Sequence, residues 1–441
     1  MNSKLRKEQE TCMLSGKEKR VLRLIEDNSQ EIVELLRKLI GFKTVAPSLG
    51  ERVEHDEYVR HQAFVSEVLR DFGLGVDIWE IDPSTLQDHP GAGVIRDRDC
   101  SNMPVLVGRL ESEGSGRSLI LNGHYDVVPV GELQNWCKDP FKAEVSDNKV
   151  FGRGSSDMKA GIAAMIEAIG FIRRAGLKIN GDITLEIVPE EEVTEMGTLA
   201  CCQRGYTADA AIIPEPTSMK VLVAMRGSMH GKITVFGRSG HAAVRQAHWT
   251  EGGAVNAISK AAKIITALEE LTSEWKDRPD KRHKLLDPDI VVATEIKGGD
   301  YWEKYPEKVE IGFSANFLGT SNNAEEIEEK IISVANTDPW MRQNPPSLGF
   351  SWVYGAEIDE SEPMVQITLN VLQDLGFESD VIGWGTLSDA IHLVNYSGIP
   401  TISVGPDDKT IHGANEFCEV DQLVATTKVL ALSILRWCQG P

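Results

Sequence analysis

The sequence predicts an α/β protein with a mixed, largely parallel central sheet and a small α+β domain inserted into it. Three patterns support this class. Strand-length apolar runs alternate with helical stretches over residues 1–219. Residues 220–354 have a different order of strands and helices, and the strand–helix alternation resumes at 355–441. Strands that alternate with helices favour parallel pairing, because each helix returns the chain to the start of the next strand.

The first part of the chain has apolar side chains at helical spacing in two stretches, 18–41 and 56–72, and Gly73 ends the second. Short apolar runs bounded by turn residues predict strands. The other elements expected before residue 219 are strands at 104–110, 118–122, 183–188 and 208–213 and a helix at 158–174.

The segment 220–354 begins with an alternating strand at 230–236, in which His230, Lys232 and Thr234 share one face. It continues with a helix at 252–270, a polar, basic loop at 275–285, strands near 290–297 and 307–318, a helix at 323–335 and a strand at 348–353. This strand–helix–strand–strand–helix–strand order is ferredoxin-like. The last part returns to alternation, with a helix at 362–376, a strand near 379–383, a helix at 388–397 and a strand at 401–404.

Composition excludes several classes of protein. With 41% hydrophobic and 26% charged residues, the chain resembles an ordinary soluble globular protein. Its net charge of −21 argues against nucleic-acid and anionic-membrane partners, and no apolar run reaches the ~20 residues of a membrane span. Seven cysteines without a CxxC pair argue against a disulfide framework. Since the first twenty residues also lack the apolar core of a signal peptide, we expect a cytoplasmic protein.

Side chains that can bind a metal occur at five places, each next to a predicted strand or helix. They are His124, Asp157, the triplet Glu190–Glu192, Glu215 and His412. Ligands of open α/β sheets bind at the carboxyl ends of the strands, where four of the five places lie. Two histidines with several carboxylates suit Zn²⁺, and also Co²⁺ or Mn²⁺.

Each of these residues alone has an ordinary interpretation. A single histidine is more often structural, a Glu-Pro pair is usually a turn, and a run of glutamates is usually a solvated surface. The segment Gly152-Arg153-Gly154 lacks the third glycine of a dinucleotide fingerprint and the lysine of a P-loop, so a nucleotide-dependent enzyme is disfavoured. The occurrence of all five places in order on one α/β pattern favours a metal site.

The ordered set of motifs resembles the M20 family of co-catalytic metallopeptidases, within the acetylornithine deacetylase/succinyl-diaminopimelate desuccinylase group. The resemblance extends over roughly residues 20–435 and is specific as a set. The matching segments are Gly123–Pro129, Trp136 with Asp139–Phe141, Gly152–Gly154 with Asp157–Gly161, Glu191-Glu192, Glu215–Thr217, Gly240–Ala243 and His412–Glu416.

The resemblance implies two divalent metal ions, most simply Zn²⁺, bridged by Asp157. One ion would also bind His124 and Glu215, and the other would bind Glu192 and His412. Paired ions of this kind acidify water and polarise a carbonyl group.

The resemblance also implies that Glu191 is the general base and that Asp126 supports the metal site from behind His124. The family usually has Asp-Glu-Glu where this chain has Glu190-Glu191-Glu192. An alternative alignment with the family motif, shifted by one residue, makes Glu190 the base and Glu191 the ligand, and it remains open.

The inserted domain is expected to act as a lid and dimerisation domain, because in the resembling family a histidine at the position of His241 reaches the partner subunit's active site. There it stabilises the oxyanion. The resemblance therefore implies a homodimer.

Substrate recognition departs from the family pattern. Related amino-acid hydrolases carry an arginine that binds the substrate carboxylate, where this chain has Asn316 in the stretch Asn316–Thr320. An amide cannot replace the charged guanidinium fork. Arg226 or Arg245 could substitute for it, Asn256 is a further candidate contact, or the substrate lacks that carboxylate.

We therefore expect a two-metal amidohydrolase that cleaves a linear amide of a small N-acylated amine or amino acid, with acetylornithine-type deacylation first. Rivals are dipeptide cleavage by a dipeptidase or carboxypeptidase and deformylation of an N-formyl aminopyrimidine in thiamine salvage. The segment Asp338–Trp340 with Pro345-Pro346 resembles a subgroup that includes such deformylases. A catalytically inactive homologue is disfavoured, because neither the base nor a ligand is missing.

Overall fold

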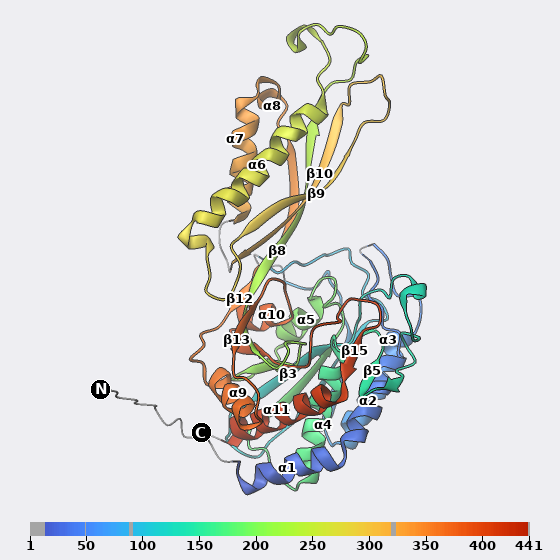
Figure 1. Cartoon of the computed structure of the whole chain (residues 1–441), viewed down its shortest axis with the longest axis vertical. Coiled ribbons are helices and arrows are strands. Elements are labelled where there is room, and N and C mark those ends of the chain that lie inside the picture. The colour runs from blue at the N-terminus through green and yellow to red at the C-terminus, as the bar shows by residue number, and fades with distance from the viewer. Residues whose placement is uncertain (1–13, 49, 88–90, 319–322, 440–441) are drawn as a thin grey trace, which may run out of the picture.

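The computed structural model describes residues 14–48, 50–87, 91–318 and 323–439. The signal-peptide expectation concerns residues 1–20, of which 1–13 lie outside the described residues, as do Gly319 and Thr320. The molecule is elongated, with a large α/β part and a smaller α+β part above it in Figure 1. Among the described residues, no helix is both long and apolar enough to cross a membrane.

The large part is built on a mixed sheet whose centre is parallel. Its strands follow the order β1-β2-β6-β3-β7-β14-β8. They are β1 (Gly75–Glu80), β2 (Pro104–Leu110), β3 (Leu119–His124), β6 (Ile183–Val188), β7 (Ala211–Ile213), β14 (Thr401–Ser403) and β8 (Val221–Phe236). Strand β3 pairs in parallel with β6 and β7, and β7 pairs in parallel with β14, whereas β1, β2 and β8 join antiparallel. The predicted α/β class with a largely parallel sheet is confirmed.

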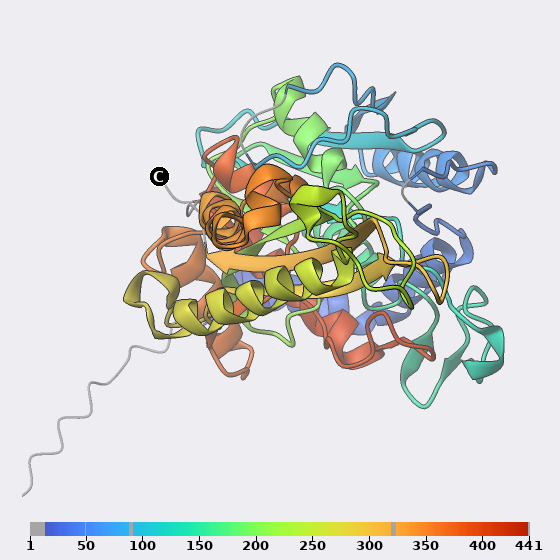
Figure 2. The ribbon, with the colours of Figure 1, turned by 90° about the horizontal axis from the view of Figure 1, so that it is seen from above.

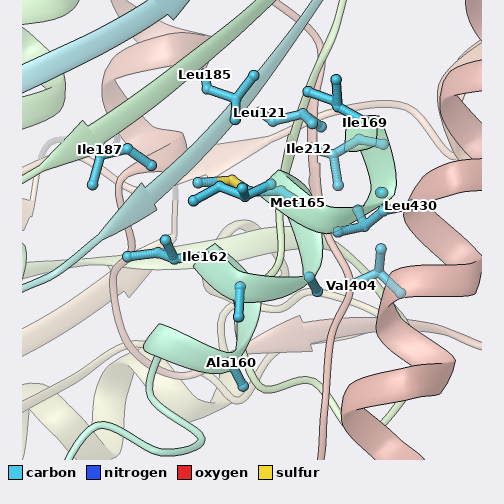
Figure 3. Close-up of a cluster of buried hydrophobic side chains, with 14 of the residues drawn as sticks. Leu121, Ala160, Ile162, Met165, Ile169, Leu185, Ile187, Ile212, Val404 and Leu430 are labelled. Carbon is cyan, nitrogen blue, oxygen red and sulfur yellow. The ribbon is translucent and has the colours of Figure 1, made fainter. Parts of the chain in front are cut away.

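Helices cover the faces of this sheet. They are α1 (Gly16–Asp27), α2 (Ser29–Gly41), α3 (Glu57–Asp71), α4 (Lys159–Arg174), α5 (Met196–Arg204), α9 (Pro363–Asp374), α10 (Ala390–Asn395) and α11 (Val420–Gln439). Helix α4 packs between the strands and α11, so that Met165 and Leu430 meet Leu121 in a fully buried core (Figure 3). Truncating a buried methionine of this kind to alanine costs about 2–5 kcal/mol. The core thus fixes α4, and with it the loop that precedes α4.

The predicted helix 18–41 is divided in two at Asn28. The Asn28 backbone N–H and side-chain amide both donate to the Leu24 carbonyl, at 3.1 and 2.8 Å. An asparagine side chain that bonds the preceding turn ends a helix locally, and periodicity does not reveal this competition. The expectation of one continuous helix was therefore wrong, although both halves bury the predicted apolar face.

The smaller part is an antiparallel sheet with helices packed on it. Its strands have the order β11-β8-β10-β9, formed by β9 (Ile290–Gly298), β10 (Lys308–Leu318), β11 (Ser347–Val353) and β8. Helices α6 (Ala257–Asp277), α7 (Asn323–Thr337) and α8 (Pro339–Gln343) accompany them, and Figure 2 shows α6 lying along the strands. A separate core contains Ile264, Trp275 and Phe313. Burial of Trp275 continues α6 into the stretch predicted as the basic loop 275–285.

Strand β8 connects the two parts. Its first half pairs with β12 (Ala356–Glu357), β13 (Val381–Trp384) and β14, and its second half pairs with β10 and β11. The predicted strand 230–236 is therefore only the second half of a longer strand. The limits 220–354 for an inserted domain stay a prediction.

A small sheet, β15-β5-β4, brings the C-terminal segment to the loop before α4. It consists of β4 (Val145–Ser146), β5 (Lys149–Phe151) and β15 (Phe417–Glu419). Pairing of Phe417 with Phe151 places the chain after His412 beside the chain that leads to Asp157. Short 3₁₀ turns at Leu133–Asn135, Trp249–Glu251 and Pro279–Lys281 complete the described elements.

Candidate two-metal active site

Three of the five predicted places lie together at the carboxyl ends of neighbouring strands. His124 is the last residue of β3, the triplet Glu190–Glu192 follows β6, and Glu215 follows β7. Since these strands are parallel neighbours, their ends meet at one edge of the sheet. The His124 side chain is 1% exposed, and its Nε2 lies 3.7 Å from carboxylate oxygens of both Glu191 and Glu215.

Asp157 and His412 complete the cluster from two loops. Asp157 Oδ1 lies 3.2 Å from His124 Nε2, and Asp157 Oδ2 lies 3.2 Å from His412 Nε2. His412 Nε2 is also 3.2 Å from Glu192 Oε2. His412 has φ +59°, a left-handed backbone that is uncommon for a residue other than glycine and is often found at functional positions. Asp157 therefore has one carboxylate oxygen toward each histidine.

The donor atoms form groups of the size that a metal ion requires. Within each of three groups, one ligand atom per residue lies within 4.8 Å of the others: His124–Asp157–Glu215, Asp157–Glu192–His412 and His124–Glu191–Glu192. The first two groups share Asp157. Glu192 Oε1 and Glu215 Oε1 are buried and have no hydrogen-bond partner among the described residues. Buried carboxylate oxygens without partners are costly, and coordination of a cation would satisfy them.

The cluster of buried carboxylates carries excess negative charge, which bound cations would neutralise. Burial lowers the pKa of His124, but Glu191, Asp157 and Glu215 together raise it well above its ordinary value. Hydrogen bonds with Asp157 and Glu192 raise the pKa of His412 to about 10. Burial raises the pKa of Glu191 and of Glu215 well above the usual range, and neighbouring carboxylates add to the effect. The donor set and the negative charge thus fit two divalent metal ions with nitrogen and oxygen ligands.

The three glutamates of the triplet have different contacts. Arg98 donates to Glu190 from Nε and Nη2, at 2.8 and 2.7 Å, so this first carboxylate is engaged in a buried ion pair. Asp126 accepts from the backbone N–H groups of Glu191 and Glu192, at 3.4 and 3.2 Å. The Asp126 carboxylate is 3.7 Å from His124 Nδ1, while its backbone oxygen is closer, at 3.0 Å. Asp126 therefore supports both the histidine and the following loop.

Glu416 holds the loop that carries Asp157, a role that the sequence did not predict. Its carboxylate accepts from the N–H groups of Gly154, Ser156 and Asp157, at 3.0, 2.9 and 3.2 Å, and from Arg153 Nη1 at 2.6 Å. The motif His412–Glu416 included the residue, but only the fold reveals that it reaches a loop more than 250 positions earlier.

A cleft of about 670 Å³ opens over the cluster. Its lining includes four of the five predicted ligands and Glu191, and it also includes residues that the sequence did not single out. Prominent among these are Ser228, His230, Ser351, Trp352 and Trp384. Strand alternation had placed His230 on a polar face, but no sequence signal placed that face opposite a metal cluster.

None of the substrate-binding candidates lines the cleft within this chain, although Asn316 pairs with Ser228, which does. Arg226 is buried and donates to the backbone oxygens of Pro288 and Asn316, at 2.9 and 2.5 Å. Asn256 caps α6 by accepting from the Ile258 N–H at 2.9 Å. Arg245 is exposed in the smaller part. The contacts of these residues give no support to a substrate role within one subunit, and that role stays a prediction.

His241 is also remote from the cluster of its own chain. It is exposed near the end of the smaller part, where its Nε2 is 3.9 Å from a carboxylate oxygen of Glu303 and its Nδ1 accepts from the Ala243 N–H at 3.2 Å. A role in catalysis would require the active site of a second subunit.

Comparisons with known proteins agree with this geometry. The chain is 31% identical over 435 residues to an N-formyl-4-amino-5-aminomethyl-2-methylpyrimidine deformylase of Halalkalibacterium halodurans, which covers 94% of this chain and 96% of the relative. It is 26% identical to a succinyl-diaminopimelate desuccinylase of Wolbachia pipientis, over 90% of this chain and 91% of the relative. A tripeptidase of Staphylococcus aureus has a similar fold, with a TM-score of 0.71 at 20% identity over 93% of this chain and 99% of that structure. Because the sequence profile of peptidase family M20/M25/M40 matches residues 120–436, well over half of the protein, the chain belongs to this family of amide-bond hydrolases.

Proposed function

We propose that the protein is a two-metal hydrolase that removes the formyl group from an N-formyl aminopyrimidine. The observation that supports the reaction is the pair of donor groups that share Asp157, with buried oxygens of Glu192 and Glu215 left without partners. The substrate comes from the relatives, since a deformylase of this kind aligns along 94% of the chain.

Two Zn²⁺ ions would occupy the two donor groups. His124, Asp157 and Glu215 would hold one, and Asp157, Glu192 and His412 the other. Bound there, the ions would acidify a water molecule and polarise the amide carbonyl. Co²⁺ or Mn²⁺ suits the same nitrogen and oxygen donors.

Glu191 is the general base in this proposal. It lines the cleft and is not needed to complete either of the two groups that share Asp157. Glu191 accepts a proton from the water that attacks the carbonyl carbon. The carbon–nitrogen bond then breaks, and the proton passes to the departing nitrogen. The products are a carboxylic acid and a free amine.

The cleft lining favours a substrate without a carboxylate. Among the described residues that line it, none is an arginine or a lysine. Acetylornithine-type and dipeptide substrates carry a carboxylate that an arginine fork would recognise, whereas an N-formyl aminopyrimidine carries none. We therefore place deformylation ahead of acetylornithine-type deacylation.

The assembly that we propose is a homodimer in the cytoplasm. Strand β9 pairs on one side with β10, and along its described length its other edge has no strand partner. Val292 and Ile296 of β9 are 44% and 54% exposed, and an open edge of this kind favours strand pairing with another chain. In the dimer, His241 of one subunit would reach the cleft of the partner and stabilise the oxyanion. The six cysteines within the described residues are all free, which suits a reducing compartment.

A substrate panel tests the proposed function. Zinc-loaded protein is supplied with the N-formyl aminopyrimidine, N-acetylornithine, N-succinyl-diaminopimelate and a dipeptide, and formate or amine release is measured. We expect the highest kcat/KM for the N-formyl aminopyrimidine. Turnover of N-acetylornithine or the dipeptide without formate release from the aminopyrimidine would contradict the substrate assignment.

A further inference from the structure

The cleft has a second wall that the proposed chemistry does not use. Four of the predicted ligands and Glu191 form one part of the lining. Residues from β8, β11 and the end of β13 form another part, which we call the second wall, and loop residues such as Gly93 and Val193 complete the lining. A linear amide has an acyl half and an amine half. When its carbonyl lies at the metal cluster, the rest of the substrate must lie against this second wall.

Sheet register assembles a polar strip on this wall. Ser351 of β11 pairs with His230 of β8, and Val353 pairs with Ser228. Residues two apart on a strand share a face, and directly paired residues share it too, so the side chains of Ser228, His230 and Ser351 lie on one face. Ser228 Oγ is 3.1 Å from His230 Nε2. That contact fixes the imidazole and leaves Nδ1 to donate to or accept from a ligand.

Aromatic surface adjoins the strip. Trp384 ends β13, is half-buried and lines the same cleft. Its apolar face is supported from behind, because Trp384 packs against a core of the larger part. Trp352 also contributes to the lining, but it pairs with the buried Met229, so its side chain lies on the opposite face of β11 from Ser351. A supported indole offers a rigid surface on which a flat ring can stack.

The charge of the cleft further restricts the class of ligand that can bind there. Asp157, Glu191, Glu192, Glu195, Glu215 and Asp408 line it, and no described lining residue is an arginine or lysine. The two divalent ions would offset the charge of their own ligands, but no described arginine or lysine of this chain lies in the lining to pair with a carboxylate on the amine half. A neutral heteroaromatic ring has a flat face that can stack on an aromatic side chain. Its ring nitrogens and amino groups can form hydrogen bonds with hydroxyl and imidazole groups.

We propose that Ser228, His230 and Ser351, together with Trp384, form the subsite that binds the leaving amine as a flat, uncharged heteroaromatic ring. This inference rests on the proposed hydrolase function and assigns substrate selectivity to these residues. His230 and Ser351 are hydrogen-bonding contacts to the edge of the ring, and Trp384 covers its face.

A matched pair of substrates tests the subsite. Zinc-loaded wild-type protein and the variants H230A, W384L and W384F are assayed with the N-formyl aminopyrimidine and with an N-formyl alkylamine that lacks the ring. We expect W384L to lower kcat/KM for the ring substrate by about 5- to 100-fold, the range found for loss of a base-stacking aromatic. H230A should lower it by about 2- to 10-fold, as expected for loss of one hydrogen bond. The alkylamine should change less than about twofold, and W384F should recover most of the loss because it restores an aromatic face. W79L, on the edge strand β1 and outside the cleft lining, is the control.

Equal losses on both substrates, or no loss on the ring substrate, would overturn the subsite. If wild-type protein hydrolyses neither substrate, the proposed function fails, and the subsite is then judged by binding alone. The probe is the aminomethylpyrimidine product, titrated into zinc-loaded protein by calorimetry. Binding that weakens in H230A and W384L, but not in W79L, supports the subsite, and absence of binding to the wild-type protein refutes it.

Discussion

Arg98 and Glu190 form a buried, two-pronged ion pair beside the metal cluster, with N–O distances of 2.8 and 2.7 Å and both side chains 1% exposed. The same guanidinium donates to the backbone oxygens of Ser48 and Pro47, at 2.7 and 2.8 Å. Arg98 thereby ties the first glutamate of the triplet to a neighbouring loop. Glu191 and Glu192 are the two that remain for the cleft.

Removing Arg98 should destabilise the protein strongly. R98M leaves the Glu190 carboxylate buried without its partner, which costs about 3–5 kcal/mol. Urea unfolding of metal-free protein measures the loss, and R98M/E190Q should recover part of it because the uncompensated charge is gone. The control is K284M, which breaks the exposed pair Lys284–Glu360 and should cost less than about 1 kcal/mol. Similar losses in R98M and K284M would contradict this account.

Glu191 and Glu192 should separate turnover from metal binding. E191Q should retain both zinc ions and lose about 10²–10⁴-fold in kcat, because the amide cannot accept a proton. E192Q should lose zinc as well as activity, since Glu192 completes the donor group with Asp157 and His412. Elemental analysis alongside steady-state kinetics measures both. Zinc loss in E191Q would instead favour the alignment with Glu190 as the base.

Asp157 belongs to two groups of possible ligands, and this predicts unequal effects of two ligand substitutions. Asp157 belongs to both donor groups, whereas Glu215 belongs to one. Wild-type protein should bind about two zinc ions, E215Q about one, and D157N close to none. Zinc should also raise the melting temperature of wild-type protein, because a ligand bound only by the folded state stabilises it. Equal zinc content in D157N and E215Q would show that Asp157 does not bridge.

His241 should act in the partner subunit. When H241A and E191Q chains are mixed and reassociated, each heterodimer contains one site with both an intact Glu191 and an intact partner histidine. Activity should return to about a quarter of wild-type in an equal mixture, since half of the dimers are mixed and each has one competent site. If both parents are inactive and the mixture stays inactive, although co-purification of differently tagged chains shows mixed dimers, this arrangement is excluded.

Glu167 predicts a pH dependence of stability that is remote from catalysis. It lies on α4 with its side chain 8% exposed, and burial raises its pKa from 4.5 to about 7, although Arg174 opposes the shift. The unfolded chain loses this proton first as pH rises, so the contribution of Glu167 to stability falls between pH 4.5 and 7.

The variant E167Q should therefore gain stability relative to wild-type protein as pH rises from about 4 to 8, by about 1–3 kcal/mol. Urea unfolding at several pH values measures the difference in free energy of unfolding between E167Q and wild-type protein. The contributions of the other titrating groups are the same in both proteins and cancel in this difference. E31Q removes the other carboxylate that Arg174 contacts, at the exposed residue Glu31, and controls for loss of an arginine contact. A difference between wild-type and E167Q that does not vary with pH would contradict the pKa shift.

Local patterns predicted most individual elements. The strand Ile183–Val188 and helices α3 and α4 lie where apolar periodicity and the flanking glycines place them. The long helix α11 was missed, and β8 was predicted too short, because a strand that crosses between two cores changes its pattern of burial midway. The break at Asn28 depends on a side-chain hydrogen bond that periodicity does not contain.

The sequence by itself determined the chemistry available to this protein: two histidines and a set of carboxylates, most of them placed where a predicted strand ends. It could do so because residue type and strand ends are local properties. The tertiary structure decided which groups meet. It directs Asp157 toward both histidines, engages Glu190 with Arg98, holds the Asp157 loop with Glu416, and brings His230 and Trp384 into the lining of the same cleft. Contacts between residues far apart in the chain depend on sheet order and packing, and no local pattern encodes them.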